Sequence, residues 1–154
     1  MLEHLQPRLL RVRHPWGRSL AWVLRSRLIL IVPLPRRLSG FTIPFIPIIF
    51  LARRLVRAVP ETARVPVYPG ERIADPALCL LLHILLHEAA HQLWAVWPEW
   101  QRWIGRRRIY GVDINAADAI SEAVCRELCE STRYGGQEIS YRSPLRWLHP
   151  VLDR

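Results

Sequence analysis

Five consecutive residues, His87-Glu88-Ala89-Ala90-His91, form the pattern H-E-x-x-H. On a helix, residues four apart share a face about 6 Å apart, so both imidazoles can reach one zinc ion at about 2.1 Å. Glu88 is rotated about 100° from His87 and lies beside such an ion without ligating it. Its carboxylate can then take a proton from a zinc-bound water, whose pKa the metal lowers toward about 7. The spacing predicts hydrolysis with His87 and His91 as zinc ligands and Glu88 as the catalytic base.

A catalytic zinc ion usually has a third protein ligand. We expect Glu122 to supply it, because it lies on a second predicted helix that can pack against the first. Asp118, one turn earlier on the same side, is expected to orient a ligand from outside the coordination sphere. Asp118 and His149 are the alternatives for the third ligand itself. The competing interpretation of Glu122 is a solvent-facing acidic stripe.

His83 stands one turn before His87. Along a helix axis His83 and His91 are about 12 Å apart, too far to share one ion. We therefore expect His83 to be a buried hydrogen-bonding neighbour of the site. The competing interpretation of the whole motif is a pair of hydrogen-bonded core histidines near a buried glutamate.

The elements that position these residues can be predicted in outline. Asp75 followed by Pro76 is a helix start, and the helix is expected over residues 76–97, up to Pro98. A second helix is expected over residues 116–133, closed by glycines, and the tail from residue 137 is expected to be irregular. Branched and aromatic residues predict strands at 27–34, 41–50 and 64–68, with a short helix at 52–59. The prolines of segment 41–50 favour a sheet edge.

These elements predict an α+β fold, in which a small, partly antiparallel sheet packs against the motif helix and the glutamate-bearing helix. A length of 154 residues allows one domain with a modest core. We expect residues 1–26 to be an arginine-rich N-terminal arm and residues 27–154 to be a single domain.

Charge is distributed unevenly along the chain. All 22 basic residues are arginine; residues 1–72 carry a balance of +10 and residues 73–154 a balance of −1. The basic half suits nucleic acid or an anionic surface, and an ordinary solvated surface is the competing interpretation. Three cysteines, no cleavable signal peptide and no clean transmembrane run favour a cytoplasmic protein.

The motif resembles that of the zincin metallopeptidases, and within them the small gluzincins, in which a downstream glutamate completes H-E-x-x-H. There is looser similarity to the ImmA/IrrE-like and SprT-like zincins. The resemblance implies that zinc is held by His87, His91 and Glu122, with Glu88 as general base and proton shuttle. It also implies a sheet whose edge strand pairs with extended peptide, for which residues 41–50 and 64–68 are the candidates.

The sequence thus predicts a zinc-dependent peptidase acting on a protein or peptide. Two alternatives remain open at this point. One is a catalytically inactive zincin-like protein that uses its arginine-rich half to bind nucleic acid or a partner. The other is a membrane-associated metalloprotease.

Overall fold

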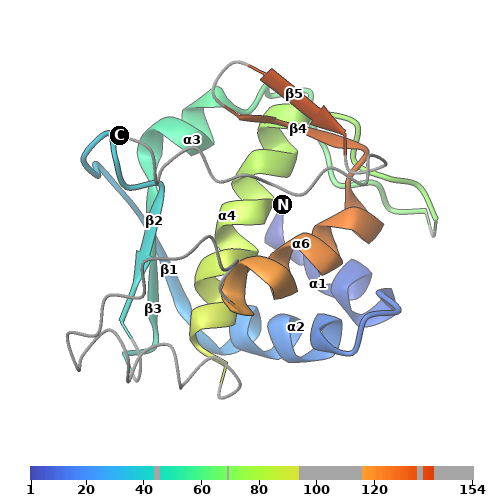
Figure 1. The fold of residues 1–154 in the computed structure, drawn as a ribbon, viewed down its shortest axis with the longest axis horizontal. Helices are drawn as coiled ribbons and strands as arrows, with labels where there is room; N and C mark the ends of the chain where they lie inside the picture. The colour runs from blue at the N-terminus through green and yellow to red at the C-terminus, as the bar shows by residue number, and fades with distance from the viewer. Residues whose placement is uncertain (44–45, 69, 94–115, 135–136, 141–154) are drawn as a thin grey trace.

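The computed structural model describes residues 1–43, 46–68, 70–93, 116–134 and 137–140 (Figure 1). Its central element is helix α4 (Pro76–His91), which carries the H-E-x-x-H motif. The carboxylate of Asp75 accepts a hydrogen bond from the backbone N–H of Leu78 (2.8 Å), so α4 begins where the sequence predicts. Helix α4 carries apolar side chains on all of its faces, and most of them are buried, as expected for a helix at the centre of a core.

Helix α4 is shorter than predicted, because it ends at His91. The backbone N–H groups of Gln92 and Leu93 bond to the carbonyls three residues earlier, at Ala89 (3.1 Å) and Ala90 (2.9 Å). This tightened turn closes the helix, and the side chain of Gln92 turns toward the sheet. The prediction of a helix continuing to residue 97 is therefore wrong at its C-terminal end.

A three-stranded sheet covers one side of α4 (Figure 1). Its strands are β1 (Leu28–Val32), β2 (Gly40–Thr42) and β3 (Ile48–Ala52), in the order β1-β3-β2. β1 pairs with β3 in parallel, and β2 pairs with β3 in antiparallel orientation. The predicted strand at 27–34 and the partly antiparallel sheet are confirmed. Segment 41–50 is not one edge strand, because its prolines interrupt the ladder: its first part is the edge strand β2 and its last part belongs to the central strand β3.

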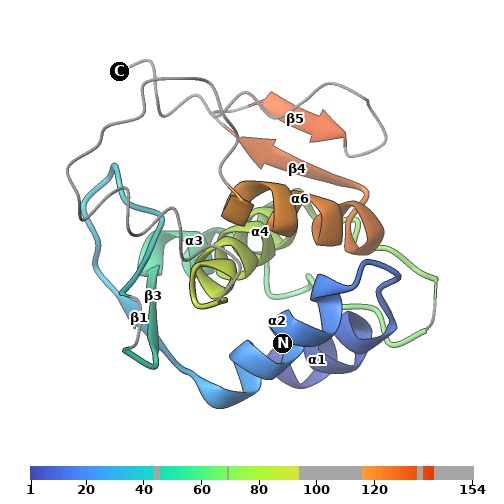
Figure 2. The ribbon, with the colours of Figure 1, turned by 60° about the horizontal axis from the view of Figure 1, so that its bottom comes forward.

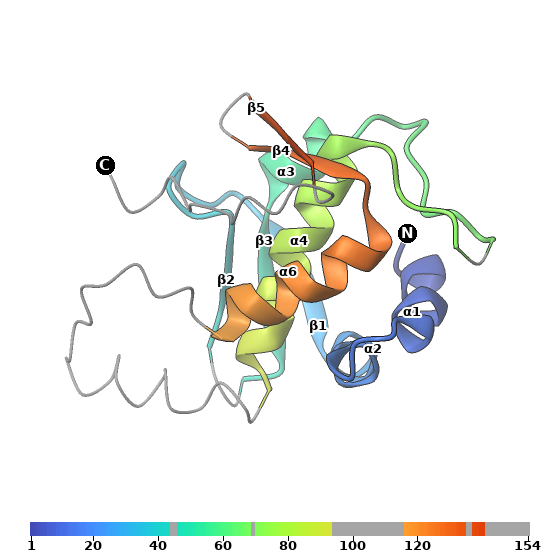
Figure 3. The ribbon, with the colours of Figure 1, turned by 45° about the vertical axis from the view of Figure 1, so that its right-hand side comes forward.

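The arginine-rich N-terminal segment forms two helices, α1 (Leu2–Arg11) and α2 (Trp16–Ser26). In all three views α4 lies between these helices and the sheet (Figures 1, 2 and 3). Leu5, Leu9 and Leu20 are fully buried in the same core cluster as the leucines of α4. The division at residue 26 stays a prediction, and the structure gives this segment a share of the core.

Three further elements complete the described fold: α3 (Arg53–Ala58), α6 (Ala116–Leu128) and the hairpin of β4 (Ser131–Tyr134) and β5 (Gln137–Ser140). α6 packs against α4, as predicted. The short helix at 52–59 is confirmed, whereas the strand at 64–68 and the irregular tail at 137–140 are wrong. The helix predicted to residue 133 ends at Leu128, because Cys129 forms a β-bridge with Ile73.

Residues 94–97 of the predicted motif helix, the stretch 98–115 that links it to the second predicted helix, and His149 lie outside the described residues. Within the described part of the chain, no helix is both long enough and apolar enough to cross a membrane.

Candidate metal centre

The two motif histidines face each other on α4. Nε2 of His87 and Nε2 of His91 are 3.0 Å apart, and the two rings meet edge to face with centroids 4.6 Å apart. Residues four apart on a helix share a face, so the backbone brings the rings together. The two ring nitrogens farthest from the backbone are therefore joined by a hydrogen bond, in which one of them carries the proton.

Asp118, at the start of α6, holds the other side of the His87 ring. Its Oδ1 lies 2.7 Å from Nδ1 of His87. The carboxylate can only accept, so this close contact favours a proton on Nδ1, which would leave Nε2 of His87 with its lone pair. The neighbouring helix thus places a negative charge beside Nδ1 of His87.

The nitrogen separation can be compared with what a zinc ion requires. Two imidazole nitrogens bound tetrahedrally at about 2.1 Å lie roughly 3.4 Å apart. The 3.0 Å separation of the two Nε2 atoms differs from this by only a few tenths of an ångström. The separation therefore matches the spacing of two zinc ligands to within a few tenths of an ångström, and an ion bound there would replace the hydrogen bond between the rings.

Glu88 lies deep in the interior, beneath the edge of the sheet. It is 8% exposed, and burial raises its pKa from 4.5 to about 7; the positive potential of His87 opposes this rise and the charge of Asp118 adds to it. A Cβ placed on Gly40 of β2 would lie 2.7 Å from Cγ of Glu88 and 2.9 Å from its Oε1. The carboxyl group therefore rests against the bare backbone of the edge strand, with a pKa suited to proton transfer near neutrality.

His91 experiences the opposite shift. Burial lowers its pKa from 6.5 to about 4, His87 lowers it further, and Asp118 works against both. At neutral pH the His91 ring is therefore uncharged, which is the form that binds a metal ion.

Glu122 is buried but points to a different partner. Its Oε1 accepts hydrogen bonds from Nη2 (2.5 Å) and Nε (3.2 Å) of Arg126, one turn along α6. Within the described residues, no group of three His, Cys, Asp or Glu side chains is arranged to hold a metal ion. Glu122 as third ligand stays a prediction, and it requires the carboxylate to leave Arg126.

The other predicted residues can be placed as follows. His83 is buried one turn before His87, and its role beside the site stays a prediction. Cys79, Cys125 and Cys129 are buried free thiols. Burial, followed by hydrogen bonds from the other two cysteines, raises the pKa of Cys129, so this group is a neutral thiol that fills the core.

Two residues near the motif were missed by sequence reasoning. Gly40 reads as a turn residue, yet it gives Glu88 its space. Gln92 ties the end of α4 to the β2–β3 turn: its amide nitrogen lies 3.0 Å from the carbonyl oxygen of Ile43 and 3.1 Å from that of Ile46. Its position directly after His91, as a polar residue ending an apolar helix, was the available signal.

Comparisons of this chain with protein-family models, with curated proteins and with solved structures gave no match. The residues and their geometry are therefore the only basis for assigning a function to this chain.

Proposed function

We propose that the protein is a zinc-dependent peptidase with a zincin-like centre on α4. The observation that supports this most strongly is the proximity of the two Nε2 atoms, 3.0 Å apart on one face of α4, with the Asp118 carboxylate 2.7 Å from Nδ1 of His87. In the metal-free protein the two Nε2 atoms share a hydrogen bond, which a bound ion would replace.

In this proposal His87 and His91 hold the ion, and Glu122 completes the ligand set after releasing Arg126. When bound, zinc would supply a Lewis acid that polarises a carbonyl and acidifies a water. Asp118 keeps the His87 ring oriented throughout.

Glu88 performs the proton transfers. Its carboxylate takes a proton from the attacking water, and the resulting carboxylic acid gives that proton to the departing amine. Its pKa is about 7 in the metal-free protein, and a cation bound beside it would lower that pKa and favour the ionised form that accepts the proton. Because Gly40 leaves no side chain between Glu88 and the sheet, the group stays close to the edge of β2.

The substrate in this proposal is a protein or peptide that adds to β2 as an extended strand. β2 ends the sheet order, so one side of its backbone has no neighbour in the described three-stranded sheet. An added strand would form main-chain hydrogen bonds there, next to Gly40 and the Glu88 carboxyl group.

The test compares wild type with Glu88→Gln, both loaded with zinc and incubated with an unfolded generic protein. We expect Glu88→Gln to cut the rate of peptide hydrolysis by about 10²–10⁴-fold, because only the proton shuttle is lost. Bound zinc, measured by elemental analysis, should stay at one ion per chain.

A matched control is Glu61→Gln, which removes the same charge at an exposed position and should leave the rate unchanged. Equal rates in wild type and Glu88→Gln would refute the assignment. Bound zinc with no hydrolysis in either protein would favour the alternative of a catalytically inactive zincin-like binding protein.

A further inference from the structure

The sheet presents an apolar outer face. Ile49 and Leu51 of β3 are buried on the side of α4, so the alternate residues Ile48 and Phe50 point the other way. Register places Leu28, Leu30 and Phe41 next to them on that outer side. Leu28 is 57% exposed and Phe41 41%, and the rings of Phe41 and Phe50 are in contact at a centroid distance of 6.1 Å.

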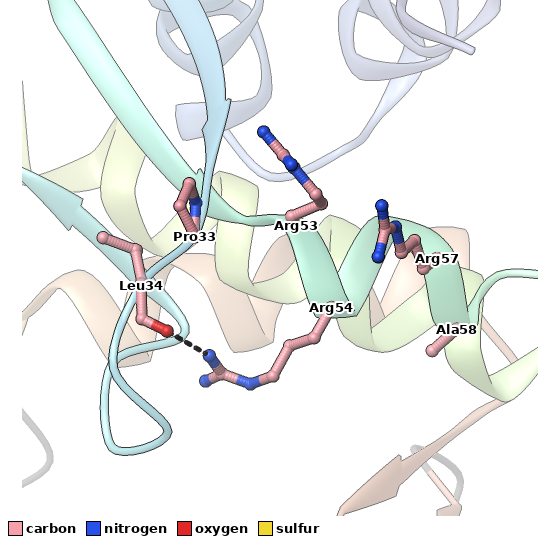
Figure 4. Close-up of a pocket in the computed structure, with 6 residues that line it drawn as sticks. All are labelled: Pro33, Leu34, Arg53, Arg54, Arg57 and Ala58. Atoms are coloured by element: carbon pink, nitrogen blue, oxygen red, sulfur yellow. Dashed lines mark hydrogen bonds between the residues drawn. The ribbon is translucent and has the colours of Figure 1, made fainter.

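An arginine pocket lies where β1 and β3 end. Pro33, Leu34, Ala58 and three arginines of the β3–α3 junction surround a cavity of about 560 Å³ (Figure 4). Arg54 is engaged there, because its guanidinium donates to backbone carbonyls between Leu34 and Leu38, including that of Leu38 at 2.7 Å. These hydrogen bonds attach the loop that follows β1, residues 34–38, to α3.

Arg53 and Arg57 have a different arrangement. They are one helical turn apart, both are exposed, and both project on the side of α3 away from Arg54 (Figure 4). Among the described residues, neither forms a hydrogen bond or an ion pair with an acid. Two neighbouring guanidinium groups without a carboxylate are suited to bind phosphate groups.

Acidic residues are absent from the sequence around this region. Between Glu3 and Glu61 there is no aspartate or glutamate, whereas residues 27–60 contain six arginines. The β1–β2 loop adds Arg36 and Arg37, both exposed, near the pocket. The sheet and α3 thus carry uncompensated positive charge beside exposed aliphatic and aromatic side chains.

We propose that the outer sheet face and the arginine pocket together dock on the surface of an anionic lipid bilayer. Guanidinium groups would contact lipid phosphates while Leu28 and Phe41 enter the headgroup boundary. Nucleic acid fits less well, because it would leave the exposed side chains of Leu28 and Phe41 without an apolar partner. The proposal does not depend on the metal centre.

The test measures co-sedimentation of the full chain with vesicles of phosphatidylcholine containing 30% phosphatidylglycerol. We expect binding that weakens as salt is raised and that falls when phosphatidylglycerol is omitted. Arg53→Gln combined with Arg57→Gln should weaken binding roughly 30-fold at low salt, since each basic residue at the surface contributes about fivefold. The same pair should also flatten the salt dependence.

The matched control is Arg11→Gln combined with Arg18→Gln, which removes the same charge from exposed positions on α1 and α2. It should bind nearly as wild type, because these helices lie on the other side of α4 (Figure 3). An equal loss in this control would overturn the assignment to the sheet face.

A second variant tests the apolar part. Leu28→Ser combined with Phe41→Ser should weaken vesicle binding at least about tenfold at low and high salt alike, with an unchanged salt slope. Circular dichroism checks that both double variants fold. The proposal is overturned if the wild-type protein does not bind anionic vesicles. Binding to a DNA duplex that requires Arg53 and Arg57, without binding to vesicles, would assign this surface to nucleic acid instead.

Discussion

Asp118 determines what the His87 ring can do. Its Oδ1 lies 2.7 Å from Nδ1 and favours a proton there, while Nε2 is hydrogen-bonded to Nε2 of His91. Without that carboxylate the ring could turn, or carry its proton on Nε2, and either change would remove a ligand of the proposed centre. In the proposed centre, Asp118 is therefore the contact through which α6 orients His87, in addition to any third ligand that α6 supplies.

We expect Asp118→Asn to weaken zinc binding about 10–100-fold, because the amide accepts a weaker hydrogen bond from His87 than the carboxylate does. Competition with a zinc-binding dye measures the affinity. Glu130→Gln is the control, since it removes the same charge from an exposed position just beyond α6. Unchanged affinity in Asp118→Asn would show that the His87 contact has no part in holding the ion.

Glu88 and His91 give the metal-free protein two opposing pH dependences. The pKa of Glu88 is raised from 4.5 to about 7, so its contribution is present below pH 4.5 and is lost as the pH rises to 7. The pKa of His91 is lowered from 6.5 to about 4, so its contribution is present above pH 6.5 and is lost as the pH falls to 4. In wild type the two effects largely cancel between pH 4.5 and 6.5.

Single substitutions should reveal each effect in the presence of a chelator. In Glu88→Gln the free energy of unfolding should rise by roughly 3 kcal/mol from pH 4 to 6.5, following His91 alone. In His91→Gln it should fall by roughly 3 kcal/mol from pH 4.5 to 7, following Glu88 alone. Urea titrations at several pH values measure these slopes, and parallel curves for the three proteins would contradict the two shifts.

At the scale of elements, the sequence predicts those features best that depend only on residues near each other in the chain. Asp75 and Pro76 define the start of α4 through capping alone, and the H-E-x-x-H spacing brings His87 and His91 together on any helix. The end of α4 depends on Gln92 reaching the β2–β3 turn, a contact between residues almost fifty positions apart. The contact of Asp118 with His87 depends on the rotation of α6 against α4, which periodicity leaves open.

The contact between β2 and α4 is a second feature that no local pattern reveals. Strand and helix approach each other closely at Gly40, where a side chain would overlap Glu88. A glycine there permits the approach of a buried carboxyl group to an edge strand.

We expect Gly40→Ala to destabilise the protein by about 1–3 kcal/mol, because the added methyl group forces Glu88 to move. In a Glu88→Ala background the same substitution should cost much less, since the overlapping side chain is gone. Gly17→Ala is the control: its Cβ would lie 2.6 Å from the carbonyl oxygen of Leu9, and Glu88→Ala cannot relieve that overlap. Urea denaturation measures all four costs, and additive effects of Gly40→Ala and Glu88→Ala would refute the contact.

At the scale of the whole molecule, the basic half and the catalytic motif are joined by packing. The sequence predicts residues 1–26 as an arginine-rich arm whose apolar residues line a loose amphipathic helix, broken by Pro15 and Gly17. In the structure, Leu5 and Leu9 of α1 and Leu20 of α2 are fully buried in the core cluster that includes α4. The arginines of this segment determine the charge of its surface, whereas the spacing of its apolar residues determines which side of each helix packs against the core.

Two adjacent leucines of α1 can be used to test whether this segment packs against the rest of the protein. Leu9 is fully buried and Leu10 is 51% exposed. We expect Leu9→Ala to lower the free energy of unfolding by about 3 kcal/mol, whereas Leu10→Ala should change it by less than about 0.5 kcal/mol. In Leu9→Ala the α4 amides should exchange faster, and the free energy of opening calculated from their exchange rates should fall by the same amount, because the two helices unfold together. If α4 kept its protection while α1 alone opened, the N-terminal segment would be an independent arm after all.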